Sequence, residues 1–150
     1  MKRIACLILL LTGVISCTRL PDASPEPRSA KMYYDRAFAR HKKGDLDGAI
    51  ADYTKAIELD PKFALAYYSR SVARGRKGDR DGVIADSTKA IELDSKNAEA
   101  YEIRGLAELA QGKDAEAQKD FDQYLKLRPD SKPELEKLIK TVKEKRAKKP

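Results

Sequence analysis

Apolar residues recur at helical spacing along most of this chain, in bursts that short polar breaks separate. The first two bursts run over Ala30 to Lys43 and Leu46 to Leu59, and the spacing within each predicts an amphipathic α-helix. Between them lie Gly44, which suits a left-handed position after a final helical turn, and Asp45, which can cap the next helix. The pattern therefore predicts a pair of antiparallel helices.

This unit repeats with a period of 34 residues. Segment 45–60 reappears at 79–94 with 13 of 16 residues identical, and a more diverged copy runs over residues 114–128. A fixed period in this range indicates units that cannot bury their apolar faces alone and stack on copies of themselves. We therefore expect an all-α solenoid, an architecture that favours a binding surface over an enzyme.

Each copy also carries a tyrosine followed four residues later by a small side chain. These pairs are Tyr33 and Ala37, Tyr67 and Ser71, and Tyr101 and Gly105. In the second helix of the first copy, the pattern continues with Ala49, Tyr53, Ala56 and Pro61. The whole pattern resembles the tetratricopeptide repeat. The resemblance implies a right-handed superhelical solenoid with repeats at 30–63, 64–97 and 98–131, followed by a capping helix and basic tail at 132–150.

Departures from the family pattern predict where the stack differs from a regular one. Ser87 stands where the other two copies place an aromatic residue, so we expect the middle repeat to be the softest. Tyr124 replaces the usual alanine, which suggests packing against something other than a further full repeat.

The capping helix is the expected partner of Tyr124. Segment 131–134 reads as a capping box with a proline in its first turn. Apolar residues then recur on one face at Leu135, Leu138, Ile139 and Val142. Beyond Val142 no apolar face continues, and we expect the helix to fray.

The first 16 residues have the layout of a secretory signal peptide, with a basic start, twelve mostly apolar residues at 4–15, and a polar continuation. The apolar run is shorter than the ~20 residues of a membrane-spanning helix. Residues 14–17, Val-Ile-Ser-Cys, resemble a bacterial lipobox, which implies cleavage before Cys17 and its lipidation; the alternative is an ordinary signal peptide cleaved nearby. Thr18 after the cysteine favours the outer membrane, and the proline-containing segment 17–29 is expected to be a flexible tether.

Composition limits the other possibilities. The formal net charge of +7 is concentrated at the ends, because segment 132–150 holds eight lysines and arginines against three glutamates. A basic stripe along the repeats is missing, so nucleic acid is not an expected partner. His41 is the only histidine, both cysteines precede residue 18, and no phosphate-binding glycine motif occurs. We therefore expect no enzymatic activity, no cofactor and no metal site.

The family resemblance also implies a concave groove lined by the first helix of each repeat. Mapped onto this chain, the candidate groove residues are Lys31, Tyr34, Phe38, Lys42, Leu65, Tyr68, Val72, Arg76 and Leu106. Glu99 and Glu102 make one end acidic. Large amphipathic rings are common binding anchors, although these aromatic residues could instead pack the seam between repeats or receive the C-terminal helix.

Two further features are tied to the same resemblance. The lysines and asparagines with which chaperone adaptors hold a C-terminal carboxylate are missing, so Hsp90-type tail binding is not expected.

An arginine and an aspartate recur in every repeat, as Arg36 with Asp52, Arg70 with Asp86, and Arg104 with Asp120. Such a pair, repeated in register, is predicted to stabilise the stack rather than to bind an anion.

The sequence as a whole predicts an exported bacterial lipoprotein, tethered through Cys17 and facing the periplasm, whose groove binds a peptide or protein of the cell envelope. Two alternatives remain at this point. The basic tail could bind anionic lipid headgroups or another polyanion, or the repeats could form a homodimer.

Overall fold

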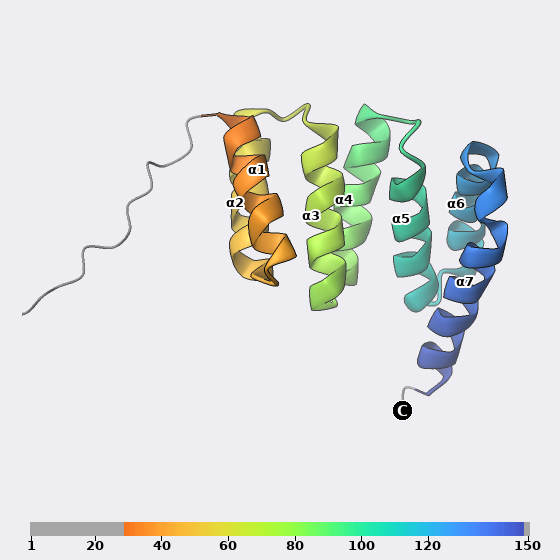
Figure 1. Cartoon of the computed structure of the whole chain (residues 1–150). Coiled ribbons are helices and arrows are strands. Elements are labelled where there is room, and N and C mark those ends of the chain that lie inside the picture. The colour runs from red at the N-terminus through yellow and green to blue at the C-terminus, as the bar shows by residue number, and fades with distance from the viewer. Residues whose placement is uncertain (1–28, 149–150) are drawn as a thin grey trace, which may run out of the picture.

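The computed structural model describes residues 29–148, and within that range every regular element is helical. Six helices form three consecutive pairs. These are α1 (Ala30–Lys42) with α2 (Leu46–Leu59), α3 (Ala64–Lys77) with α4 (Arg80–Leu93), and α5 (Ala98–Ala110) with α6 (Asp114–Leu127). A single 3₁₀ turn, η1 (Pro129–Ser131), leads into the last helix, α7 (Lys132–Ala147). The all-α solenoid expected from the sequence is confirmed (Figure 1).

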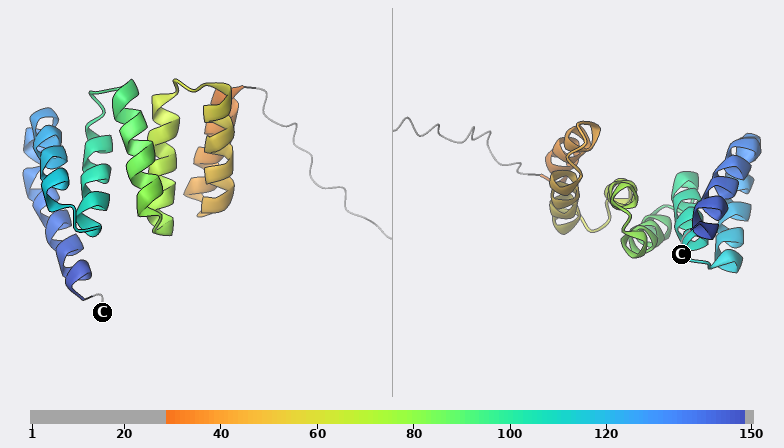
Figure 2. Two further views of the ribbon diagram at one scale, coloured as in Figure 1. Left: turned by 180° about the vertical axis from the view of Figure 1, so that it is seen from behind. Right: turned by 90° about the horizontal axis from the view of Figure 1, so that it is seen from below.

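The helices form two layers. In Figure 1, α1 and α3 lie in front of α2 and α4, and the view from behind reverses that order (Figure 2). The first helices of successive pairs pack closer to one another than the second helices do. The stack therefore curves with α1, α3 and α5 on its inner side.

Glycine makes each turn within a pair possible. Gly44, Gly78 and Gly112 have φ values of 84°, 83° and 84°, in the left-handed region that other residues rarely adopt. The Asp45 and Asp79 side chains then accept hydrogen bonds at 2.9 Å from the backbone N–H groups three residues later, as predicted for capping residues.

Small residues bring the two helices of each pair together. Ala37 and Ser71 are completely buried, and a Cβ atom added at Gly105 would lie only 2.7 Å from the ring of Phe121. The predicted close approach at this position is confirmed.

The repeated arginine and aspartate form a ladder through the stack. Arg36 binds Asp52 through two hydrogen bonds of 2.7 Å, and the pairs in the other two repeats have the same bidentate geometry at 2.7 to 2.8 Å. Arg70 also reaches back to Thr54 of the preceding repeat, at 2.9 Å. The ladder thus links helices within and between repeats, in agreement with the structural role predicted for it.

The C-terminal helix differs from the prediction in three respects. Ser131 belongs to the 3₁₀ turn, and its side chain makes no capping hydrogen bond. The expected capping box is therefore wrong. Because η1 runs directly into α7, Ser131 does not take the extended backbone of a capping residue. Leu138 is 40% exposed, whereas Leu135 is buried. The helix also continues past Val142 to Ala147 instead of fraying.

Tyr124 and α7 share one apolar cluster, as expected. Its buried members are Ala98, Leu109, Ala117, Phe121, Tyr124 and Leu135. Ile139 and Val142 of α7 pack against it, and α7 makes its main helix contacts with α5. No helix within residues 29–148 is both long and apolar enough to cross a membrane. The predicted signal peptide at 1–16 and the lipidation site at Cys17 lie outside the described residues.

Candidate functional site

A cavity of about 190 Å³ opens on the inner side of the stack, between α1 and α3. It is lined by Phe38, His41, Tyr53, Tyr68, Ser69 and Val72. Three of these, Phe38, Tyr68 and Val72, belong to the predicted groove, and the structure brings them together. The walls are mainly aromatic and aliphatic, with one imidazole and hydroxyl groups able to orient a ligand.

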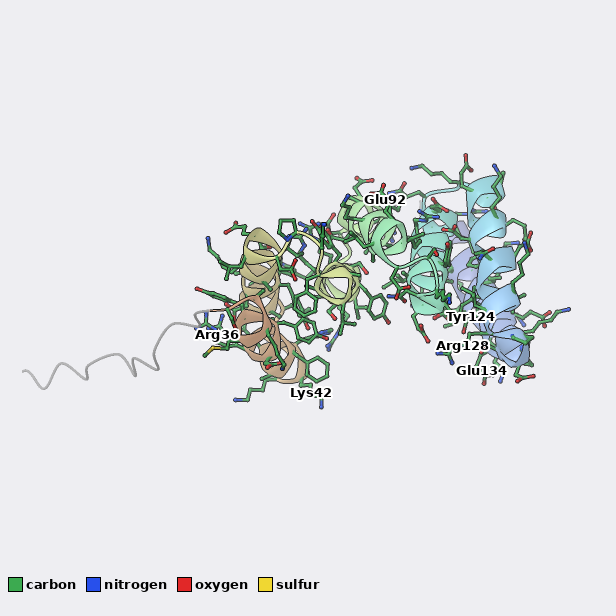
Figure 3. The ribbon with its side chains drawn as sticks, turned by 90° about the horizontal axis from the view of Figure 1, so that it is seen from above. Arg36, Lys42, Glu92, Tyr124, Arg128 and Glu134 are labelled. Atoms are coloured by element: carbon green, nitrogen blue, oxygen red, sulfur yellow. The ribbon has the colours of Figure 1, made fainter. Side chains whose placement is uncertain are left out.

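Phe38 is the most accessible ring of the cavity, with 44% of its surface exposed. Lys42, one turn further along α1, holds its ammonium 4.8 Å from the centre of this ring, which is cation–π geometry. Figure 3 shows Lys42 on the inner side of the stack, opposite Glu92 on the outer layer. An exposed ring beside a cation makes Phe38 the strongest candidate anchor on this face.

Tyr34 contacts three helices on the inner side of the stack. Its ring centre lies 5.1 Å from that of Phe63 and 5.5 Å from that of Tyr53, and its hydroxyl lies 3.2 Å from the Ser69 hydroxyl. These contacts join α1, α2 and α3. Tyr34 therefore packs the seam between repeats, and its part in ligand binding stays a prediction.

A second cavity, of about 350 Å³, lies where α1 begins. Lys31, Tyr34 and Leu65 of the predicted groove line it, together with Ala30, Asp35, Asp60 and Phe63. Lys31 is not a free cation, because its ammonium lies 2.7 Å from the Asp35 carboxylate. Leu65 is exposed and gives this cavity an apolar rim.

The two cavities differ from the α5 end of the inner face, which carries Glu102 and also Glu99, whose carboxylate pairs with Arg128. Burial raises the pKa of Glu102 and the neighbouring Glu99 raises it further. Burial is also the main cause of the raised pKa of Tyr68, with Glu99 and Glu102 contributing. A cationic group of a ligand would be stabilised beside this pair.

The remaining predicted groove residues, Leu106 and Arg76, are not among those that line the α1–α3 cavity. Leu106 is partly buried against the apolar cluster that includes Leu135 of α7, and it also lines an opening between α3 and α5. Arg76 lies at the rim, where its guanidinium donates to the His41 carbonyl at 3.4 Å. Burial and the charge of Arg76 lower the pKa of His41, which favours the neutral imidazole.

Sequence reasoning missed Tyr53, Phe63 and Ser69 as residues of the inner face. Tyr53 belongs to the second helix of its repeat and was expected to be core, yet its ring also closes the cavity. Burial raises its pKa to about 12, with Tyr34 adding to the rise and Ser69 partly offsetting it. Phe63 and Ser69 carry no family signature, so only their proximity to Tyr34 in the fold could have identified them.

The structure consists of three antiparallel helix pairs with a 34-residue period and a terminal covering helix. These features define a helical repeat protein with an inner binding face. Two family models match the chain, one described as TPR repeat over residues 38–78 and one described as tetratricopeptide repeat over residues 68–132. The chain belongs to the tetratricopeptide repeat family.

Several solved structures share this fold. The second TPR of Spaghetti (RPAP3), bound to the HSP90 peptide SRMEEVD, is 33% identical with a TM-score of 0.65, over 67% of this chain and 93% of that one. The second TPR domain of human RPAP3, in complex with the HSP70 peptide SGPTIEEVD, is 31% identical with a TM-score of 0.66, over 81% and 100%. The Arabidopsis OM64 TPR domain is 28% identical with a TM-score of 0.68, over 80% and 95%. No curated protein matches the sequence.

Proposed function

We propose that this protein is a non-enzymatic adaptor that binds a peptide or protein segment on its inner face. The observation that carries the proposal is the cavity between α1 and α3, where the exposed ring of Phe38 stands beside Tyr68 and Val72. Two similar domains are described as bound to peptides, which supports the same mode of recognition here.

The partner we propose differs from those acidic peptides. Aromatic residues occupy the inner face of α1 at Tyr34 and Phe38, and α5 presents Glu99 and Glu102 at its start. A peptide with an acidic end would meet like charge at that end of the face, which costs free energy. An apolar anchor in the α1–α3 cavity, with basic groups toward α5, fits the charges better.

Photo-crosslinking tests the binding face. A benzophenone amino acid placed at Val72, in the cavity, is expected to form covalent adducts with a partner in a Gram-negative host, whereas the same group at Ala85, exposed on the outer layer, is not. Phe38→Ala should reduce the adducts, and Met32→Ala, an exposed residue outside the cavity, should leave them unchanged. Equal labelling from both positions, or none, would remove the proposal.

We further propose that the adaptor is held at a bacterial membrane, most favourably the outer membrane, by a lipid on Cys17 after export and removal of residues 1–16. The support is the short apolar run that ends in Val-Ile-Ser-Cys. Two or more acyl chains give stable anchoring, whereas one gives only marginal binding. A membrane-held binding face raises the effective concentration of a periplasmic partner.

Intact mass and membrane fractionation test this tether. The wild type should lose residues 1–16, gain acyl mass and remain with the membrane, and Cys17→Ala should abolish the acylation. A soluble wild type without acyl mass would contradict the tether while leaving the binding face to be judged by crosslinking.

A further inference from the structure

Arginines cover the ends of two inner helices. Arg76 of α3 donates to the His41 carbonyl at the end of α1, and Arg146 of α7 donates to the Leu109 carbonyl near the end of α5, at 2.8 Å. Helix C-termini carry unpaired carbonyl groups and partial negative charge, so a cation at this place is favourable. The seam between α3 and α5 breaks the pattern, because Ala110 occupies in α5 the position that Arg76 occupies in α3.

Two adjoining cavities lie at this seam. One, of about 190 Å³, is lined by Gly75, Arg80, Val83, Ile103, Leu106, Ala107 and Ala110, and apart from Arg80 its walls are apolar or glycine. The other, of about 150 Å³, is lined by Arg80, Ala110, Val142, Lys145 and Arg146. Arg80 and Ala110 belong to both, so an apolar compartment opens directly beside a cationic one.

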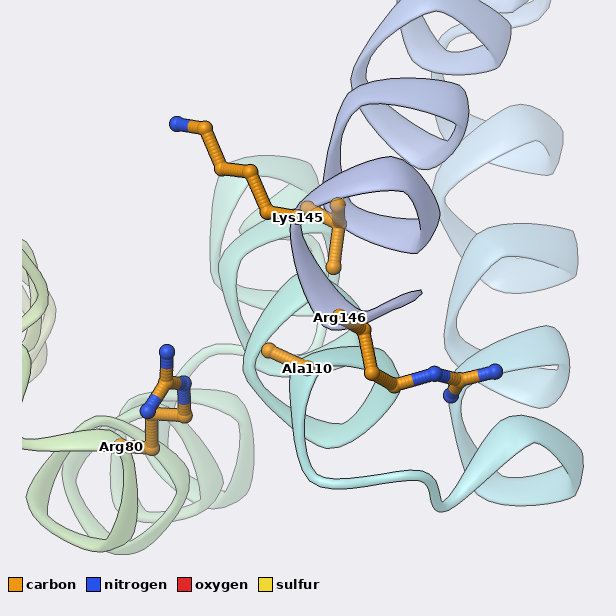
Figure 4. A pocket seen from close by; sticks show the side chains of 5 residues that line it. Arg80, Ala110, Lys145 and Arg146 are labelled. Atoms are coloured by element: carbon orange, nitrogen blue, oxygen red, sulfur yellow. The ribbon is translucent and has the colours of Figure 1, made fainter. Parts of the chain in front are cut away.

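The cations of this seam are not equally engaged. Arg146 binds the Asp114 carboxylate in addition to the Leu109 carbonyl. Among residues 29–148, by contrast, neither Arg80 nor Lys145 forms an ion pair or a side-chain hydrogen bond. Figure 4 shows these two side chains extending from α4 and α7 on opposite sides of the opening, with the Arg146 guanidinium turned away from both. No carboxylate lines either cavity.

We propose that this seam binds the C-terminal residue of a peptide that ends in a bulky apolar side chain. The side chain enters the compartment formed by Gly75, Val83, Ile103 and Leu106, and the terminal carboxylate lies between Arg80 and Lys145. This inference rests on the proposed function, since it assumes a peptide partner, but it concerns a site separate from the α1–α3 cavity.

The dimensions and charges fit that occupant. The apolar compartment is open to solvent, and its volume of about 190 Å³ has room for part of one ring or branched chain. Because Arg80 and Ala110 line both compartments, an apolar group and an anion carried by one residue can occupy them together. Two exposed cations on either side of one carboxylate provide charge-assisted hydrogen bonds.

Nuclear magnetic resonance titration of the ¹⁵N-labelled protein tests the site with three probes. N-acetyl-leucine has both groups, N-acetyl-leucinamide lacks the carboxylate, and N-acetylglycine lacks the side chain. N-acetyl-leucine should shift the amide signals of Gly75 and Ala110 saturably, and the other two should bind at least about tenfold more weakly, equivalent to about 1.4 kcal/mol. A hexapeptide ending in leucine should bind more tightly than the same peptide ending in leucinamide.

Variants then locate the contacts. Arg80→Gln and Lys145→Gln should each weaken N-acetyl-leucine binding about three- to tenfold, an order-of-magnitude expectation for one exposed charge. Lys140→Gln, on α7 but outside the cavities, is the matched control. Ala110→Arg should abolish binding by supplying the missing arginine. The ¹⁵N spectrum reports whether this variant is folded. If it is not, the Arg80→Gln and Lys145→Gln variants decide whether the seam binds N-acetyl-leucine.

Several results would overturn the proposal. The first two are binding of N-acetyl-leucinamide as tight as that of N-acetyl-leucine, and tighter binding of octanoate than of N-acetyl-leucine. The other two are amide shifts centred on Phe38 and Val72 instead of Gly75, and no saturable shift at the solubility limit of N-acetyl-leucine. Each leaves the photo-crosslinking test at Val72 unaffected, so failure of this site and failure of the proposed function are distinguishable.

Discussion

Arg146 on α7 donates hydrogen bonds to both oxygens of the Asp114 carboxylate, at 2.7 and 3.1 Å, across 32 residues of sequence. Asp114 begins α6, so this pair fixes the last turn of α7 to the start of the preceding helix. The same guanidinium also caps α5 at Leu109. The final turns of α7 therefore depend on polar contacts where the apolar face has ended.

Replacing this arginine should loosen the end of α7 without unfolding the repeats. In Arg146→Gln, we expect faster amide hydrogen exchange from Val142 to Ala147 and unchanged exchange in α1 to α4, because each repeat contacts chiefly its neighbours. Lys148→Gln, which removes a charge from the same turn, is the control. Unchanged exchange in the arginine variant would show that the pair has no part in ordering this end.

Glu108 takes the place of a second arginine that binds the ladder aspartate in the first two repeats. The first two repeats carry Arg40 and Arg74 at this position, and both bind the ladder aspartate, at 2.8 Å and 2.9 Å. In the third repeat one buried oxygen of Glu108 has no hydrogen-bond partner within the described residues. Burial raises the pKa of Glu108, and Asp120 raises it further, although Arg104 opposes the rise.

Restoring the arginine should stabilise the protein. Glu108→Arg replaces an unpaired carboxylate beside Asp120 with a hydrogen-bonded cation, and we expect the free energy of unfolding to rise by about 1 kcal/mol. Urea denaturation at neutral pH measures the change. Glu116→Arg, exposed on α6, controls for the gain of positive charge alone; an equal rise in both variants would contradict the ladder explanation.

The same carboxylate predicts a pH dependence. Because its pKa is higher in the folded than in the unfolded state, its contribution to stability is full below the ordinary glutamate pKa of 4.5 and is lost as the pH rises through the folded pKa. The stability of Glu108→Gln relative to the wild type should therefore increase from pH 4.5 to pH 7, as measured by urea denaturation at both values. A difference independent of pH would mean that Glu108 titrates normally.

Ser87 should make α4 the least stable part of the stack. This side chain is completely buried, its hydroxyl lacks a hydrogen-bond partner among the described residues, and the equivalent positions hold Tyr53 and Phe121. Ser87→Ala removes the unsatisfied hydroxyl with little change of shape and should raise the free energy of unfolding by about 1 kcal/mol. The control is Ser95→Ala at an exposed position, which should change stability by less than about 0.5 kcal/mol.

Two glycines in inner helices should respond differently to the same substitution. Gly105→Ala would place a Cβ 2.7 Å from the Phe121 ring and 3.2 Å from the Ala117 carbonyl, and should cost about 1 to 3 kcal/mol through overpacking. At Gly75 the nearest atom, on Val83, is 3.4 Å away, so Gly75→Ala should be neutral or stabilise by up to about 1 kcal/mol through helix propensity. Thermal unfolding of both variants measures the contrast.

The sequence predicted the fold well because its information is local and repeated. Glycine at 34-residue intervals marks each turn, and Asp45 and Asp79 cap the helices that follow. Each helix pair therefore requires only its own residues and one neighbouring copy to be recognised.

The candidate site was predicted less completely because it depends on contacts between copies and on one irregular helix. Tyr34 faces the groove by its position in the repeat, but the rings of Tyr53 and Phe63 hold it in the seam. Leu106 is an inner-face residue that packs partly against the cluster under α7, and the period gave no information on where α7 would lie. The cavity at Ala110 likewise exists because α5 has alanine where α3 has Arg76. The sequence shows this difference, but its effect depends on where the ends of the neighbouring helices lie.

The near identity of residues 45–60 and 79–94 has a consequence for how the chain reaches this structure. During folding, α2 and α4 offer almost the same surface to α1 and α3, so a collapsing chain meets two competing pairings that differ by few native contacts. Tyr53 and Ser87 distinguish them, because only the tyrosine fills the space beside Tyr34. The Tyr53 ring is thus one of three differences that favour the native alignment; the others are Leu46 against Arg80 and Ala49 against Val83.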